Sequence, residues 1–175
     1  MIKEIVTYPN KILRTKSKDV EKFDSELHTL LDDMYDTMIA KDGVGLAAIQ
    51  ISVPLNVLLI CIPDENNIQT PDNLLEAINP KITHKDDALI VYTEGCLSVP
   101  EFHEDIKRAQ NVTVEYFDRN GQKHNMEAQD FLAVVWQHEM DHLEGHLFIE
   151  KLSLLKRKKF EKEWKKKLKE EKNKR

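Results

Sequence analysis

The stretch Gln137-His138-Glu139-Met140-Asp141-His142-Leu143-Glu144-Gly145 contains the pattern His-Glu-x-x-His and decides how the rest of the chain is arranged. In a helix, residues four apart share a face and lie ~6 Å apart along the axis, so two imidazoles can bind one divalent cation. Glu139 then lies beside the cation without being needed as a ligand. That is the position of a carboxylate base next to a metal-bound water.

The residues around this stretch predict a helix that buries its histidines. An apolar stripe with i, i+3, i+4, i+7 spacing leads into the first histidine: Phe131, Val134, Val135 and His138. Asp130 is expected to cap the start of the helix, and Gly145 to end it. The histidines should therefore point into the protein.

The third metal ligand is not found downstream of this helix. Phe148 occupies the place where a longer metalloprotease pattern would require a histidine. His146 lies ~12 Å further along the axis than His138, too far to share one ion. Glu161 and Glu163, which another protease class would use, sit in a lysine-rich run. We therefore expect the third ligand upstream.

Composition predicts one domain without a membrane anchor. The 175 residues are 41% hydrophobic and 33% charged, a composition typical of one well-packed domain with a charged surface. No apolar run approaches the ~18 residues of a membrane span, and the first residues lack the features of a signal peptide. We expect a cytoplasmic protein, in which Cys61 and Cys96 stay unbridged.

Charge is distributed unevenly along the chain. Residues 156–175 hold 12 Lys+Arg and 4 Glu, a balance of +8, whereas residues 1–155 hold 14 Lys+Arg and 27 Asp+Glu, a balance of −13. We expect residues 1–155 to form a catalytic metallohydrolase domain and residues 156–175 a basic helical tail, either part of that domain or an extension of it.

The predicted elements alternate between helix and strand signals. Asp24 or Ser25 begins an amphipathic helix that ends by Gly43, with an apolar face of Leu27, Leu30, Leu31, Met34 and Met38. Strand-like runs cover 55–61, 77–83, 88–92 and 112–116, and Asn120-Gly121 favours a hairpin turn after the last. The order predicts an α+β fold: antiparallel β-sheets packed around a central metal-binding helix, with an N-terminal helix and a C-terminal basic helix.

Cys96 is the best upstream candidate for the third ligand. It lies in Glu94-Gly95-Cys96-Leu97-Ser98, directly after a glycine. A lone cysteine is more often a small buried apolar residue, but here a two-histidine helix lacks a partner. One thiolate and two imidazoles leave a coordination position open for water, as in catalytic sites.

Three segments together resemble the signature motifs of the peptide deformylase family. They are Gly43-Val44-Gly45-Leu46-Ala47-Ala48-Ile49-Gln50, Glu94-Gly95-Cys96-Leu97-Ser98 and the histidine stretch, in this order. The resemblance covers the chain to about residue 155. It implies removal of the N-terminal formyl group from nascent formyl-methionyl polypeptides, with Fe(II) as the native ion, although a Cys/His₂ set also suits Zn(II), Ni(II) or Co(II).

The resemblance also implies a role for each matching residue. Cys96, His138 and His142 match the metal ligands, Glu139 the general base, and Gln50 and the Leu97 backbone amide the oxyanion donors. Arg108 matches a structural arginine. His103 stands where many relatives have an arginine that contacts the peptide backbone, so that contact is expected to differ here.

The chemistry can also be argued from the residues themselves. A cation lowers the pKa of its bound water, and Glu139 takes the proton as hydroxide attacks a carbonyl carbon and later returns it to the leaving amine. A formyl group is the smallest acyl group, and the close backbone at Gly43, Gly45 and Gly95 suits a cramped acyl site. We expect Val44, Gly45 and Gly95 to contact the substrate there. The apolar face of Phe131, Val134 and Val135 is suited to a methionine side chain.

Two other functions are compatible with these residues, and the C-terminal tail suggests one further binding partner. A zinc peptidase would need a Glu or His as third ligand, and an RNA-associated module with a structural metal would need a fourth protein ligand. The tail spaces Phe160, Trp164 and Leu168 four apart, which predicts a helix with a broad basic face. We expect this helix either to pack on its own domain or to bind ribosomal RNA.

Overall fold

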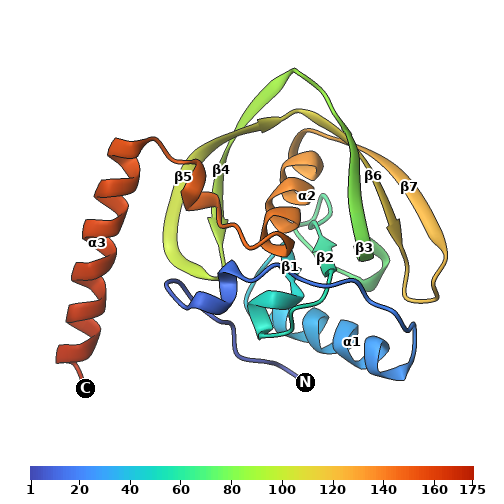
Figure 1. The fold of residues 1–175 in the computed structure, drawn as a ribbon, viewed down its shortest axis with the longest axis horizontal. Coiled ribbons are helices and arrows are strands. Elements are labelled where there is room, and N and C mark those ends of the chain that lie inside the picture. Colours follow the sequence, from blue (N-terminus) through green and yellow to red (C-terminus); the bar gives the residue numbers. More distant parts are fainter.

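The computed structural model describes residues 1–175, which form an α+β fold as predicted (Figure 1). The helices are α1 (Ser25–Ala40), α2 (Asp130–Leu143) and α3 (Leu154–Asn173), with four short 3₁₀ helices at Lys11–Arg14, Ala48–Ile51, Pro71–Asn73 and Phe148–Lys151. The strands are β1 (Gly45–Ala47), β2 (Val57–Cys61), β3 (Leu74–Lys85), β4 (Leu89–Cys96), β5 (Val99–Ala109), β6 (Asn111–Phe117) and β7 (Lys123–Gln129).

The main sheet has five strands in the order β1-β2-β3-β6-β7, and every neighbouring pair is antiparallel. Its strand β2 is buried at all five positions. Leu58 and Ile60 face the apolar cluster around α2, whereas Val57, Leu59 and Cys61 face the cluster around α1. Alternate residues of a strand point to opposite faces, so a continuous apolar run is expected where both faces are covered.

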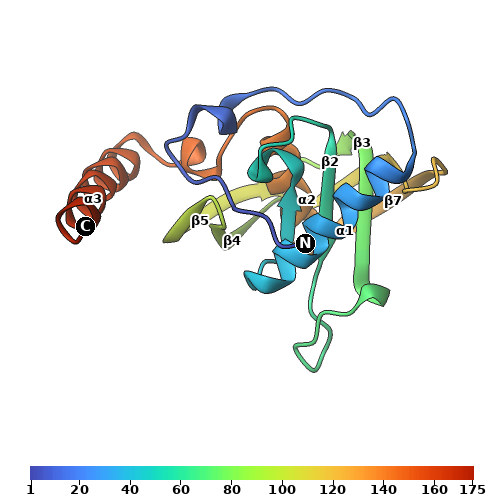
Figure 2. The ribbon, with the colours of Figure 1, turned by 90° about the horizontal axis from the view of Figure 1, so that it is seen from below.

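The N-terminal helix α1 confirms the prediction from its apolar spacing. The Asp24 side chain accepts a hydrogen bond from the Leu27 amide at 3.1 Å, the bond of an N-cap. Its methionines Met34 and Met38 are fully buried against the sheet. Figure 2 shows α1 lying along one face of this sheet.

Helix α2 lies at the centre of the molecule, between the five-stranded sheet and the separate hairpin β4–β5 (Figure 1). The Gln137 amide joins it to β5, because it accepts a bond from the Ala109 N–H at 3.2 Å and donates to the Ala109 carbonyl at 2.8 Å. Gly145 ends the helix region with φ +81°, and a Cβ there would clash with the backbone of Arg14.

The predicted cap at the start of α2 is wrong. Gln129 is the N-cap residue and makes no side-chain capping bond. Asp130 is already the first helical residue, and its carboxylate accepts from the Gln110 side chain at 3.0 Å. A tertiary partner therefore uses the carboxylate that local capping chemistry would otherwise employ.

Two strands had no clear signal in the sequence. Strand β1 has only three residues, fewer than a period-2 pattern needs. Strand β5 carries Pro100 and several charged residues, and only some of its positions are buried. The hairpin after β6 is found as predicted, with the Asp118 side chain accepting from the Asn120 and Gln122 amides across the turn.

The basic tail is helical, and two residues of its apolar stripe are buried. Phe160 and Trp164 are 2% and 8% exposed and pack against Tyr8, whereas Leu168 is 38% exposed. Figures 1 and 2 both place α3 at the edge of the molecule beside β5. No helix in the structure combines the length and apolar character needed to cross a membrane.

Candidate active site

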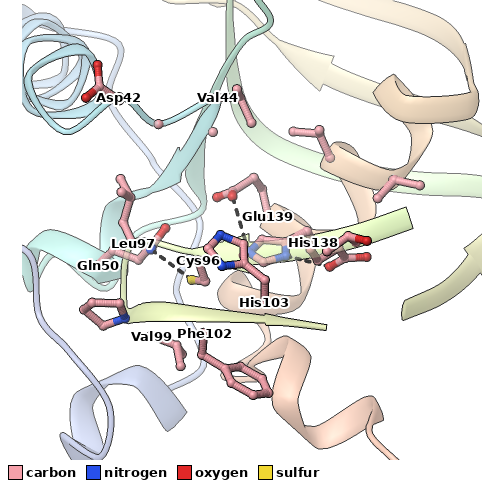
Figure 3. A pocket seen from close by; sticks show the side chains of 18 of the residues that line it. Asp42, Val44, Gln50, Cys96, Leu97, Val99, Phe102, His103, His138 and Glu139 are labelled. Atoms are coloured by element: carbon pink, nitrogen blue, oxygen red, sulfur yellow. Dashed lines mark hydrogen bonds and ion pairs between the residues drawn. The ribbon is translucent and has the colours of Figure 1, made fainter. Parts of the chain in front are cut away.

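A cavity of about 440 Å³ opens between β1, the hairpin β4–β5 and α2. This volume lies in the range of small-molecule binding sites. Figure 3 shows its lining with Gln50 and Cys96 on one side and His138 and Glu139, from α2, on the other. The three motifs, far apart in the sequence, meet here because β1, β4 and α2 converge.

The predicted ligands come together at this cavity: Cys96 and His138 line it, and His142 is fully buried beside them. One donor atom each from Cys96, His138 and His142 lies within 4.8 Å of the other two. The Cys96 Sγ lies 3.4 Å from the His142 Nε2. A tetrahedral ion with Zn–S and Zn–N distances of about 2.3 and 2.1 Å would separate such atoms by about 3.6 Å. The three side chains thus fit a single transition-metal ion.

A buried ion-pair network fixes the orientation of His138. Its Nδ1 lies 2.9 Å from Glu94 Oε1, which leaves Nε2 to face the other two candidate ligands. The Arg108 guanidinium donates two bonds to Glu94, at 2.7 and 3.0 Å, and a third to Asp141 at 2.9 Å. Burial raises the pKa of Glu94, but the bonds from His138 and Arg108 lower it overall. Glu94 therefore stays ionised and orients the imidazole.

Glu139 lies beside these ligands and makes no side-chain hydrogen bond, only a long ion pair with His138. Its Oε2 is buried and makes no hydrogen bond, and its Oε1 lies 3.8 Å from His138 Nε2. Burial raises the pKa of Glu139 to about 7, in spite of the nearby positive charges of His138 and Arg108. Such a carboxylate is suited to exchange a proton near neutral pH.

Gly45 makes room for this carboxylate. A Cβ at Gly45 would lie 2.9 Å from Glu139 Oε1 and 3.0 Å from its Cγ. A Cβ at Gly43 would lie 2.8 Å from the Leu97 side chain. A side chain at Gly45 would therefore displace Glu139 of α2, and one at Gly43 would displace the tip of Leu97 in the Cys96 motif.

Gln50 is held so that its amide nitrogen points at the candidate metal ligands. Its Oε1 accepts from the Ala47 N–H at 2.9 Å, and its Nε2 donates to Ser98 Oγ at 3.0 Å. The same Nε2 donates to Cys96 Sγ at 3.6 Å, as Figure 3 shows. Because the oxygen is already bonded to the backbone, the side chain presents its donor end to the cavity. Leu97 lines the same cavity next to Cys96.

The other predicted substrate-binding residues also line the cavity: Val44, Gly45, Gly95, Phe131, Val134 and Val135. Phe131, at the mouth, packs on Tyr92 with ring centroids 5.5 Å apart. His103 lines the cavity and lies over Gly95, where a Cβ would come within 2.5 Å of its ring. Arg108 is absent from the lining and is buried beneath the ligands.

Sequence reasoning missed several residues of this site. One of them is Glu94, which belongs to the Cys96 motif. The sequence could have indicated it, because it is a charged residue two positions before the cysteine at the end of a strand. The remaining missed lining residues come from the turn end of the hairpin β4–β5 and from the loop before β1: Asp42, Thr93, Val99, Pro100, Glu101 and Phe102. They carry no local chemical pattern, and only the folded arrangement of β1, β4 and β5 reveals them.

Comparison with known proteins agrees with this geometry. The family model of polypeptide deformylase matches residues 2–158. The chain is 58% identical over 172 residues to the peptide deformylase of Campylobacter jejuni, covering 98% of each chain. It is 53% identical over 171 residues to that of Helicobacter pylori strain J99, again covering 98% of each.

Solved structures show the same fold. The peptide deformylase of Ehrlichia chaffeensis in complex with actinonin superposes with a TM-score of 0.86 at 40% identity, covering 95% of this chain and 97% of that one. The Plasmodium falciparum enzyme gives a TM-score of 0.88 at 31% identity, covering 97% of each chain. The chain therefore belongs to the peptide deformylase family, enzymes that remove the N-terminal formyl group from nascent peptides.

Proposed function

We propose that this chain is a metal-dependent hydrolase that removes the formyl group from formyl-methionyl nascent polypeptides and releases formate. The single observation that carries the proposal is the convergence of Cys96, His138 and His142 beside the buried carboxylate of Glu139, whose Oε2 makes no hydrogen bond. Since its substrates begin as nascent chains, we further propose that it acts in the cytoplasm.

The proposed cofactor is one divalent cation held by the Cys96 thiolate and the two imidazoles. Fe(II) is the proposed native ion, and Zn(II), Ni(II) and Co(II) are compatible with the same ligand set. When bound, such an ion supplies a Lewis acid that polarises a carbonyl and lowers the pKa of a coordinated water.

Protein groups around the ligands perform the remaining steps. Glu139 accepts the proton of the attacking water and returns it to the amine nitrogen as the C–N bond breaks, so that formate and a free N-terminus result. The Gln50 amide, and the Leu97 backbone N–H, donate to the carbonyl oxygen as negative charge develops on it. Each donor of this kind contributes about 3–4 kcal/mol in comparable enzymes.

The cavity walls provide the proposed substrate contacts. The methionine side chain lies against the apolar residues of α2 and the β1 segment: Val44, Phe131, Val134 and Val135. The formyl hydrogen faces the backbone of Gly45 and Gly95, which lie against the Glu139 side chain and the His103 ring. A larger acyl group would therefore collide with Glu139 or His103.

Formate release from formyl-Met-Ala-Ser tests this proposal directly. The expected result is stoichiometric formate with Met-Ala-Ser as the only peptide product, and no turnover of the acetylated tripeptide. Cleavage of an internal peptide bond would instead identify a peptidase. Absence of both reactions in protein that carries one metal ion per chain would refute a catalytic role.

We propose in addition that the exposed basic side of α3 binds the ribosome. Two observations support this proposal. Residues 156–175 carry a net charge of +8. Four lysines of this segment are exposed and lie away from the buried apolar stripe: Lys158, Lys162, Lys165 and Lys169. Deleting the tail would also remove the buried Phe160 and Trp164, so charge replacement is the cleaner test.

The test replaces these four lysines with Gln and measures ribosome pelleting at several salt concentrations. The matched control replaces four exposed lysines of the body with Gln: Lys11, Lys22, Lys81 and Lys85. Affinity should fall only in the α3 variant, and the slope of log K against log salt should flatten by about 0.7–0.9 for each phosphate that the variant no longer neutralises. Equal pelleting by both variants would defeat the docking proposal.

A further inference from the structure

One segment of β5 forms both a wall of the active-site cavity and the surface on which α3 rests. Pro100, Glu101 and Phe102 line the active-site cavity. The same three residues also line one side of a small hollow of about 120 Å³. Residues of α3, among them Phe160, Trp164 and Lys167, line its other side. We call Pro100–His103 the rim. The hollow shows that the rim and α3 are incompletely packed, so that individual contacts matter.

Lys167 is the polar contact between α3 and the rim. Its Nζ lies 2.8 Å from the Glu101 carboxylate and donates to the Pro100 carbonyl at 3.3 Å. The same ammonium lies 5.0 Å from the centre of the Trp164 ring, which fixes its direction. No other lysine of α3 contacts the rim in this way, since Lys156 pairs further along β5 with Glu104.

Phe102 is the apolar contact. Its ring lies 4.5 Å from Phe160 of α3 and 5.9 Å from Phe148, measured between ring centroids. Figure 3 shows Phe102 directed away from the metal ligands and the adjacent His103 directed towards them. Because successive strand residues face opposite sides, anchoring Phe102 in the aromatic cluster also presents His103 to the cavity.

The rim also contains a strained residue. Glu101 has φ +64°, a left-handed conformation that costs a non-glycine residue of order 1–2 kcal/mol. Such residues persist where surrounding contacts hold them, and they concentrate at ligand sites. Here the residues on both sides of the strain are held by α3: Pro100 by Lys167 and Phe102 by Phe160.

We propose that α3 is a positioning element of the active site, and that Lys167 holds the rim in the conformation that contacts the peptide beyond its first residue. The inference rests on the proposed function, in which methionine faces α2 and the reacting carbonyl faces Cys96. The rim is the wall of the cavity that remains for the following residues of the substrate. Lys167 touches no reacting atom, so it acts through the rim alone.

The test compares two substrates, formyl-methionine and formyl-Met-Ala-Ser, with the Lys167→Ala variant of the full metal-loaded chain. Because Lys167→Ala removes an exposed ion pair, the KM for the tripeptide should rise about twofold to fivefold, and kcat should not change. The KM for formyl-methionine should not change. Lys167→Arg, which can keep the ion pair, should restore the tripeptide KM.

Lys166→Ala is the matched control, because it removes the same charge from an exposed neighbouring position of α3. A second variant, Trp164→Ala, removes the ring beneath the ammonium and should raise the tripeptide KM at least as much, with circular dichroism verifying that α3 remains folded. Equal tripeptide KM values in wild type, Lys167→Ala and Trp164→Ala would overturn the inference, as would a fall in kcat on both substrates. Wild-type protein inactive on both substrates would instead refute the proposed function.

Discussion

Replacement of Arg108 tests whether the buried network beneath the candidate metal ligands stabilises the fold as its geometry requires. Arg108→Met keeps the apolar stem of the side chain but removes the charge. The guanidinium is 3% exposed and its partner Glu94 is 5% exposed, so the carboxylate would be left buried without its main counter-charge. Breaking a buried pair in this way costs about 3–5 kcal/mol.

Arg119 provides an unusually close control. It also donates two bonds to a glutamate, Glu76, at 2.8 and 2.6 Å, and one to an aspartate, Asp32, at 2.9 Å. Its side chain is 32% exposed, and its partners Asp32 and Glu76 are 65% and 15% exposed, against 3% and 5% in the Arg108–Glu94 pair. Because water can replace the lost bonds there, Arg119→Met should cost only about 0.2–1 kcal/mol.

Thermal and urea unfolding measure the difference. In a domain of this size, 1 kcal/mol shifts Tm by about 2–4 °C. The expected losses are therefore about 6–20 °C for Arg108→Met and at most about 4 °C for Arg119→Met. Metal affinity should also fall about 10- to 100-fold in Arg108→Met alone, since Glu94 orients His138. Equal Tm shifts in the two variants would show that burial of the network contributes no additional stability.

Four further outcomes follow from the site. Cys96→Ser should lose most of the bound metal while Cys61→Ser, at a buried thiol outside the ligand cluster, should retain it; equal metal content by elemental analysis would reject Cys96 as a ligand. Glu139→Gln should keep its metal and lose about 10²–10⁴-fold in kcat, and near-normal turnover would show that Glu139 is not the base. Gly45→Ala should lower kcat by up to about 10²-fold with unchanged metal content, because a Cβ 2.9 Å from Glu139 Oε1 must displace that carboxylate. An unaltered kcat would mean that the position of the Glu139 carboxylate is not critical. Activity in air should decay faster for Fe(II)-loaded than for Ni(II)-loaded protein, because a redox-active ion bound by a thiolate is oxidisable, whereas identical half-lives would contradict this ligand set.

Local sequence patterns determined a large part of this protein. The spacing of apolar residues predicts α1 and α2, the Asn-Gly pair predicts the β6–β7 hairpin, and His-Glu-x-x-His places two imidazoles on one helix face. Each of these features depends on neighbours within about one or two helical turns or one hairpin, so it can be read without knowing the fold. The three motifs, taken in their order along the chain, likewise indicate the family from the residues alone.

Only the tertiary structure decided which of these groups meet. Glu94 bonds to His138, 44 positions away, because β4 lies against α2, and Asp130 fails as a cap because the side chain of Gln110 reaches it. The apolar stripe of α3 was compatible with a free helix or a packed one, and the aromatic cluster with Tyr8 and Phe102 settles it as packed.

The rim shows the physical reason for this division. Strand β5 has an irregular mixture of charged and apolar residues, so its local pattern predicts no element. Its position follows from its antiparallel register with β4, which places His103 opposite Gly95 next to the candidate metal ligands. Periodicity is encoded by adjacent residues, whereas the packing of this hairpin against α2, through Ala109 and Gln137, is a property of the whole folded chain, and the walls of the active site depend on that packing.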